Sequence, residues 1–327
     1  MAGLIALSSA GIGLVTSAQA ATKMKVKTYN VAYLSYGVAN SYDAPMLAAA
    51  KAVAAGHGHV NVTVFDSQST YTTQVAQLQT VVNSGKYQGI IVQPIYGAVL
   101  VPGVKAAIKK GIKVVNIDQI LGSNYASDQI QVKGLSGNVV FFPSKIGSQL
   151  AALTVQACAS ANPCNVVLVH NYKGYEPDSA ISTAFASGLT KDANAKVVAE
   201  GDGFYTPATA LTFVQDALVA NPTVNVIVGA DQDCEGAQSA LTSAKNTTAK
   251  LVCYGASATG ISAVKSGAWF ADVAQMPATE GQMGMIALIK AMTTGKGSGS
   301  QNPVAKLPNN GVVTAANANK FAGEWPG

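Results

Sequence analysis

The chain has 327 residues, of which 49% are hydrophobic and 11% are charged, and its formal net charge is +5. This length suits two domains, and so apolar a composition excludes a disordered protein. A protein that binds nucleic-acid phosphates needs a dense patch of Lys and Arg, whereas the longest basic run here is the pair Lys109-Lys110. These features argue against a nucleic-acid partner and indicate a weakly charged globular protein.

The N-terminal segment, residues 1–20, has the composition of a secretory signal peptide. It is small and apolar, contains no acidic residue, and ends in Ala18-Gln19-Ala20, the small-x-small pattern of a cleavage site. A membrane helix is the alternative, but Ser, Gly and Thr interrupt the apolar run, which is short for a span. No Lys or Arg precedes the apolar part, which leaves open a start upstream of Met1. We expect an exported protein that is cleaved after Ala20.

The mature chain alternates between strand-like apolar runs and Ala-rich segments of helical period. Strands are expected at residues 31–35, 60–65, 89–92, 112–117, 166–169, 196–199, 224–228, 250–253 and 269–273. Helices are expected at residues 44–55, 73–82, 99–110, 146–158, 179–189, 208–220, 235–244 and 280–292. Continuous apolar strands separated by helices are typical of an α/β fold, with parallel sheets covered on both faces.

One block of this pattern occurs twice, which favours two lobes over a single large sheet. Residues 81–118 and 218–255 have equal length, and each reads helix end, strand, polar loop, helix and strand. We therefore expect two doubly wound lobes joined by three chain crossings, the first of them near residues 123–139. The expected boundaries are residues 23–127 plus 277–306 for the first lobe, and 128–276 plus 307–327 for the second.

The four cysteines agree with export, because their number is even and an oxidising compartment would allow them to pair. We expect Cys158 to pair with Cys164 across a short polar turn. For Cys234 and Cys253 a disulfide and two buried free thiols both remain open. The spacing is not that of a zinc site and only three His are present, so no metal is expected.

Polar and aromatic residues follow the expected strands, where open parallel sheets bind their ligands. Aromatic rings can stack on the apolar faces of a sugar, and carboxylates and amides can bond its hydroxyls. The strand ends supply Tyr36, Asn40-Ser41-Tyr42-Asp43, Asp118-Gln119, His170-Asn171-Tyr172, Phe204-Tyr205, Asp231-Gln232-Asp233, Tyr254 and Gln275. The set predicts a neutral polyhydroxyl ligand and no cofactor.

Six segments, in order along the chain, resemble the type I, ribose-binding-like class of periplasmic sugar-binding proteins. They are LSYGVANSYDAPML in the first strand-to-helix turn, then VFDSQ, IIVQP, VVNIDQ, GADQD and DVAQMP. The resemblance implies a two-lobe periplasmic receptor, monomeric and without enzymatic activity, that delivers a pentose, hexose or polyol to the membrane permease of an ABC importer.

The resemblance also implies roles for single residues. Asn40 and Tyr42 match the family's N-lobe amide and stacking ring, and Asp118 matches its main hydroxyl-accepting carboxylate. The C-lobe aromatic matches Phe204 or Tyr205, and Gln275 matches the hinge glutamine.

Several positions depart from the family pattern and argue against ribose itself as the ligand. Gln119 stands where ribose binders often have Arg, and Ile181 falls near the family's C-lobe Arg. Asp231 falls where Asn or Asp is common, while Tyr254 keeps an aromatic whose usual Asp partner is replaced by Gly255. Secondary ligand contacts are expected from the nearby residues Tyr36, Tyr175, Glu176 and Asp178.

Two other functions remain as alternatives. One is a periplasmic receptor for a non-sugar signal that acts on a sensor or chemotaxis partner. The other is an enzyme that uses the cleft, although the chain has no G-x-S-x-G elbow, P-loop or H-E-x-x-H motif. Asp231 and Asp233 are too close in sequence to flank a glycosidic bond from opposite sides.

Overall fold

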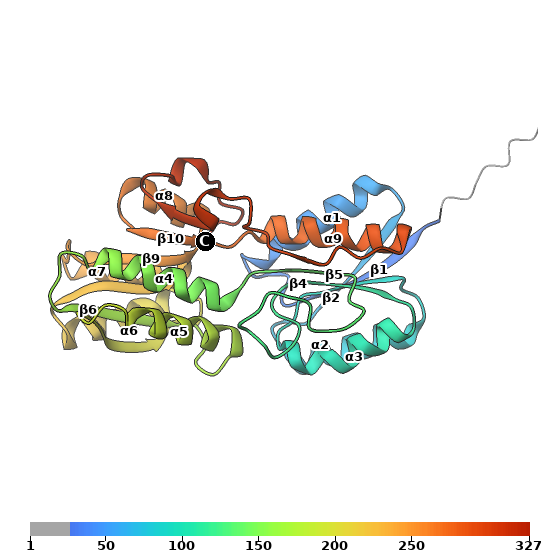
Figure 1. Cartoon of the computed structure of the whole chain (residues 1–327), viewed down its shortest axis with the longest axis horizontal. Coiled ribbons are helices and arrows are strands. Elements are labelled where there is room, and N and C mark those ends of the chain that lie inside the picture. The colour runs from blue at the N-terminus through green and yellow to red at the C-terminus, as the bar shows by residue number, and fades with distance from the viewer. Residues whose placement is uncertain (1–26) are drawn as a thin grey trace, which may run out of the picture.

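The computed structural model describes residues 27–327, so the expected signal peptide lies outside the described residues. Two lobes lie side by side along the long axis of the molecule, and the C-terminus lies between them (Figure 1). Each lobe has a six-stranded sheet with helices on both faces. Within residues 27–327, no helix is both long and apolar enough to cross a membrane.

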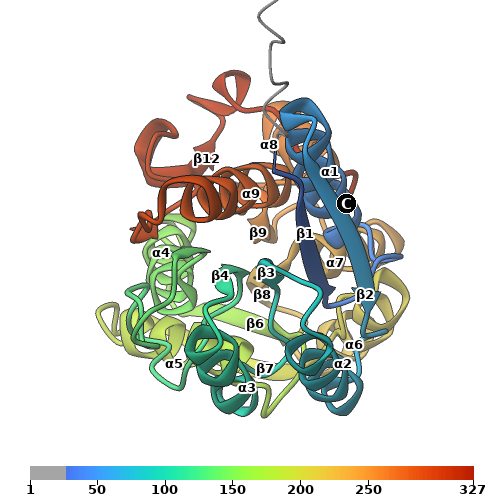
Figure 2. The same ribbon diagram turned by 90° about the vertical axis from the view of Figure 1, so that its right-hand side faces the viewer.

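The first lobe is built on a parallel sheet whose strand order is β11-β5-β4-β3-β1-β2. The strands are β1 (Tyr29–Ser35), β2 (Val60–Asp66), β3 (Gly89–Val92), β4 (Lys113–Asp118), β5 (Gly137–Val140) and β11 (Ser300–Gln301). One face packs on α1 (Asp43–His57) and α9 (Pro277–Thr294), and the other on α2 (Tyr71–Ser84) and α3 (Gly97–Lys109) (Figure 2). The central strands β3 and β4 are buried on both faces, which explains their largely apolar sequences.

The second lobe repeats this plan with the order β12-β10-β9-β8-β6-β7, in which only β12 is antiparallel to its neighbour. Its strands are β6 (Cys164–His170), β7 (Ala195–Asp202), β8 (Val224–Ala230), β9 (Lys250–Gly255), β10 (Ala271–Ala274) and β12 (Val312–Thr314). Helices α4 (Pro143–Ala157) and α5 (Glu176–Leu189) cover one face. Helices α6 (Pro207–Ala220), α7 (Asp231–Ser243) and α8 (Ala258–Ser266) cover the other, and short 3₁₀ turns η1 (Pro308–Gly311) and η2 (Ala318–Lys320) flank β12.

The expected end of the first lobe at Ser127 is wrong, because β5 pairs with β4 inside the first sheet. The chain therefore crosses first between β5 and α4, then between β10 and α9, and finally between β11 and β12. Strand β5 is only four residues long and contains a buried Asn138. The Asn138 amide is satisfied by Asn116 on β4 (2.8 Å) and by the Asp128 carbonyl (2.8 Å). These partners make a polar residue acceptable in a buried strand, and the local sequence gives no sign of them.

All four cysteines are paired. Cys158–Cys164 ties the end of α4 to the start of β6, and Cys234–Cys253 ties α7 to β9. The disulfide expected between Cys158 and Cys164 is confirmed, and the question left open for Cys234 and Cys253 resolves to a bond.

Candidate ligand-binding site

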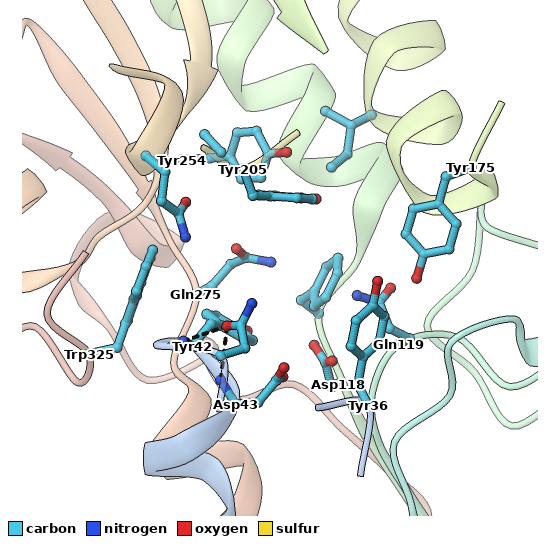
Figure 3. A pocket seen from close by; sticks show the side chains of 15 residues that line it. Tyr36, Tyr42, Asp43, Asp118, Gln119, Tyr175, Tyr205, Tyr254, Gln275 and Trp325 are labelled. Carbon is cyan, nitrogen blue, oxygen red and sulfur yellow. Dashed lines mark hydrogen bonds between the residues drawn. The ribbon is translucent and has the colours of Figure 1, made fainter. Parts of the chain in front are cut away.

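A cavity between the two lobes collects residues from the carboxyl ends of both sheets (Figure 3). Its empty space, counted out into open solvent, amounts to about 670 Å³. The first lobe contributes the end of β1, the start of α1 and the end of β4. The second contributes the start of α5 and the ends of β7, β8 and β9. The lining residues are Tyr36, Asn40, Tyr42, Asp43, Asp118, Gln119, Phe141, Tyr175, Ile181, Tyr205, Ala230, Gln232, Tyr254, Gln275 and Trp325.

Two carboxylates at the first-lobe side are held by one buried glutamine. The Nε2 of Gln93 donates to Asp43 Oδ1 (2.5 Å) and to Asp118 Oδ2 (3.0 Å), while its Oε1 accepts from the backbone N–H of Tyr36 (3.1 Å). Asp118 ends β4 with φ of 67°, a left-handed conformation that Asp tolerates better than most residues. Its Oδ1 is buried and has no hydrogen-bond partner among the described residues. One strong acceptor is therefore left at the cavity.

Burial shifts the pKa values of the carboxyl groups on the first-lobe side of the cavity. It raises the pKa of Asp118 to about 7, although the hydrogen bond from Gln93 and the nearby Gln119 amide lower it. Burial also raises the pKa of Asp43 well above its usual value, and the nearby Asp118 charge adds to this rise. Glu280 on α9 is fully buried in the same region and its pKa is likewise raised by burial and by Asp118. A ligand hydroxyl that donates to Asp118 would favour its ionised form.

The aromatic rings come from both lobes and from the C-terminal tail, residues 321–327; in the first lobe, Tyr36 follows β1 and Tyr42 precedes α1. Tyr205 directs its hydroxyl to Asp178 Oδ1 (2.7 Å), and the Tyr254 hydroxyl accepts from Asn171. Both hydroxyls are thus engaged within the protein, while their rings line the cavity. Ring faces of this kind suit the C–H faces of a sugar.

The C-terminal tail adds a wall that joins both lobes. Trp325 packs edge-on against Tyr42 of the first lobe, with ring centroids 5.5 Å apart. Its Nε1 donates to the Gly255 carbonyl at the end of β9 (3.0 Å). Glu324 accepts from the backbone N–H of Thr279 (2.8 Å) in the first turn of α9. The tail is therefore a fixed part of the site.

Most residues expected at the site do lie together around the cavity. These are Tyr36, Asn40, Tyr42, Asp118, Gln119, Tyr175, Tyr205, Tyr254 and Gln275. They converge because the parallel strands of each lobe end at the same edge, and these two edges face each other.

Phe204, Glu176 and Asp178, which were expected to contact the ligand, do not line this cavity. Phe204 is 42% exposed and packs on Tyr172, so Tyr205 is the aromatic that lines the cavity. Glu176 is exposed in the first turn of α5. Asp178 is buried, but its oxygens accept from the Tyr205 hydroxyl and from the Tyr172 N–H (2.9 Å).

Asp231 also does not line the cavity. It is fully buried at the start of α7, and its Oδ2 accepts from the backbone N–H of Ser257 (2.7 Å). Asp272 lies next to it, and burial raises the pKa of both carboxyls. Asp231 therefore has a structural role between α7 and the loop that follows β9.

Sequence reasoning left several lining residues unassigned: Asp43, Phe141, Ile181, Ala230, Gln232 and Trp325. Asp43 and Gln232 are among the strand-end residues noted in the sequence, but no ligand role was assigned to them. No local signal marks Trp325, because the residue it bonds, Gly255, is 70 positions away in the chain.

Comparisons with known proteins agree with this architecture. A family model described as a periplasmic binding protein domain matches residues 31–297. The D-allose-binding periplasmic protein of Escherichia coli is 28% identical over 260 residues, covering 76% of this chain and 79% of the relative. Among solved structures, a periplasmic solute-binding protein of an Actinobacillus succinogenes ABC transporter, with bound D-allose, has a TM-score of 0.76 at 19% identity and covers 90% of this chain and 100% of its own. A Bacillus halodurans ABC transporter solute-binding protein with bound myo-inositol has a TM-score of 0.75 at 18% identity, and the match covers 91% of this chain and 98% of that one. The chain belongs to the periplasmic binding protein domain family and has the type I two-lobe fold.

Proposed function

We propose that this protein captures a neutral sugar or related polyol in the cleft between its lobes and delivers it to an ABC importer. The observation that carries the proposal is the buried Asp118, whose Oδ1 is left without a partner at the cavity. A carboxylate that accepts from a neutral hydroxyl forms a charge-assisted bond worth about 1.5–3 kcal/mol. The relatives named above are solute-binding proteins of this kind, and two of the three are named for D-allose or hold it.

The proposed mechanism uses ligand contacts to both lobes. A ligand that touches both lining surfaces stabilises the closed arrangement over an open one, and closure becomes the signal that a permease recognises. We place the protein in the periplasm as a monomer, with residues 1–20 as the signal peptide that is removed on export. The ligand-binding residues we propose are Asn40, Tyr42, Asp118, Gln119, Tyr205, Tyr254 and Gln275, with Tyr36 and Tyr175 in support.

Equilibrium binding tests this function. The mature chain is titrated by calorimetry with pentoses, hexoses and polyols, and the ligand is recovered afterwards and identified by mass spectrometry. We expect at least one neutral sugar or polyol to bind with micromolar affinity or better, on the order of −8 kcal/mol, and to be recovered unchanged. Conversion of the recovered ligand would instead support an enzyme, and a panel without any binding would reject sugar capture.

A further inference from the structure

The two walls of the cavity differ in chemistry. The first-lobe wall carries the cavity's two carboxylates, Asp43 and Asp118, and the amides of Asn40 and Gln119. Three buried oxygens of first-lobe residues that line the cavity, Tyr42 Oη, Asp118 Oδ1 and Gln119 Oε1, have no hydrogen-bond partner among residues 27–327. This side is therefore equipped to bond several hydroxyls.

The second-lobe wall is largely apolar. Phe141, Ile181 and Ala230 line it with their side chains, and each is less than a tenth exposed. The rings of Tyr205 and Tyr254 complete it. The Tyr205 hydroxyl is already bonded to Asp178, and the Tyr254 hydroxyl to Asn171. Gln232 is the polar side chain of this wall, and Gln275 lies at the crossing between the lobes.

Buried carboxylates of the second lobe could have supplied hydrogen-bond acceptors to this apolar wall, but they are bonded to other protein groups. Asp178 is bonded by Tyr205 and Tyr172, Asp231 by Ser257, and Asp233 by the Ala230 N–H (3.2 Å). The chain also contains no arginine, since its 21 basic residues are all lysines, and none of the lysines in residues 27–327 lines the cavity. Gln232 can bond only a limited number of ligand hydroxyls at this wall. Any further hydroxyl held there would lose its hydrogen bonds to water without gaining a protein partner, which is unfavourable.

We propose that the ligand is a deoxy sugar, bound with its hydroxylated edge on the first lobe and its methyl or methylene edge against Ile181 and Phe141. This inference rests on the proposed function and narrows it. A methyl group gains from burial at such a wall, whereas the CH₂OH group of the parent sugar brings a hydroxyl that the wall leaves unbonded.

Matched pairs that differ by one oxygen test the proposal: D-fucose against D-galactose, L-fucose against L-galactose, L-rhamnose against L-mannose, and 2-deoxyribose against ribose. Calorimetry on the mature chain is expected to give the tightest binding in the set for a deoxy member, with an affinity at least about tenfold above that of its parent. Parents that bind as tightly or more tightly would overturn the inference and leave sugar capture standing. No binding by any member, together with no binding by other sugars or polyols, would reject both.

Ile181→Thr and Ile181→Val form a matched test of the wall, because the two new side chains have nearly the same shape and differ by one hydroxyl. Valine is expected to weaken binding of both members of the best pair to the same extent. Threonine is expected to reduce the deoxy preference at least about threefold relative to valine, because it offers the parent's hydroxyl a partner. Equal preferences in the two variants would count against Ile181 as the selecting residue.

Discussion

At the level of single residues, the site depends on how Gln93 arranges its carboxylates. One amide nitrogen is shared by Asp43 and Asp118, which fixes both groups while leaving Asp118 Oδ1 free. The position of Asp118 was predictable because it ends a largely apolar strand. The same rule does not place Asp231 at the cavity, since its Oδ2 accepts from the Ser257 N–H. Strand pattern locates a residue at the sheet edge, but the direction of its side chain is set by partners far away in sequence.

Asp118→Asn and Asp118→Ala are expected to lower ligand affinity by about tenfold or more, because each removes the charged acceptor. Asparagine keeps the shape and tolerates the left-handed backbone, so a loss in this variant isolates the charge. Titration calorimetry measures the effect, and Asp216→Ala on the exposed surface of α6 is the control. Wild-type affinity in both Asp118 variants, with unfolding unchanged, would refute the assignment.

The burial of these carboxyl groups determines how the protein's stability depends on pH when no ligand is bound. Burial raises the pKa of Asp118 and of Asp178 to about 7, whereas in the unfolded chain a carboxyl of this type ionises near pH 3.9. The folded protein thus holds more protons between about pH 4 and pH 7, so its free energy of unfolding falls as the pH rises through this window.

Urea unfolding is therefore expected to show a lower midpoint at pH 8 than at pH 5. The drop is expected to be smaller in Asp118→Asn, which has one fewer raised carboxyl. Glu200, whose pKa is lowered by Lys173 and His170, acts only at lower pH and does not oppose this trend. A midpoint that is equal or higher at pH 8 would contradict the prediction.

At the level of elements, the tail and β5 are the parts that sequence reasoning missed, and for the same reason. The helices and long strands could be predicted because their periodicity is local, and the repeated block indicated two similar lobes. Strand β5 is four residues long and depends on Asn116 to satisfy Asn138. The tail depends on contacts with Tyr42, Gly255 and Thr279. Such long-range partners leave no mark on the local pattern.

The tail places one of the two tryptophans of the chain at the cavity, which makes ligand binding visible by fluorescence. Trp269→Phe leaves Trp325 as the reporter, and its emission is expected to change in intensity or wavelength when the ligand binds. Trp325→Phe is the matched control: it leaves Trp269, which is 1% exposed in the second-lobe core, and no change is expected. A response carried by Trp269 alone would show that the tail does not line the ligand site.

At the scale of the whole molecule, the lobes are joined across the cleft by Tyr175. This residue precedes α5 in the second lobe, and its hydroxyl donates to the Ile95 carbonyl of the first lobe (2.8 Å). Its ring packs edge-on against Tyr96, which in turn packs against Tyr71 (centroids 5.2 Å and 5.3 Å apart). Tyr175 therefore contributes to closure as well as lining the cavity.

Tyr175→Phe is expected to shift the protein toward open forms, because it removes one interlobe hydrogen bond and keeps the ring. A bond of this type contributes about 1 kcal/mol, which corresponds to roughly a fivefold change in the ratio of closed to open forms. Small-angle X-ray scattering without ligand measures this as an increased radius of gyration, a readout that loss of a ligand contact would not move. Tyr71→Phe is the control, because within residues 27–327 its hydroxyl makes no hydrogen bond and its ring contact survives the change. If both variants scatter like the wild type while Tyr175→Phe still binds less tightly, Tyr175 acts through the ligand and not through closure.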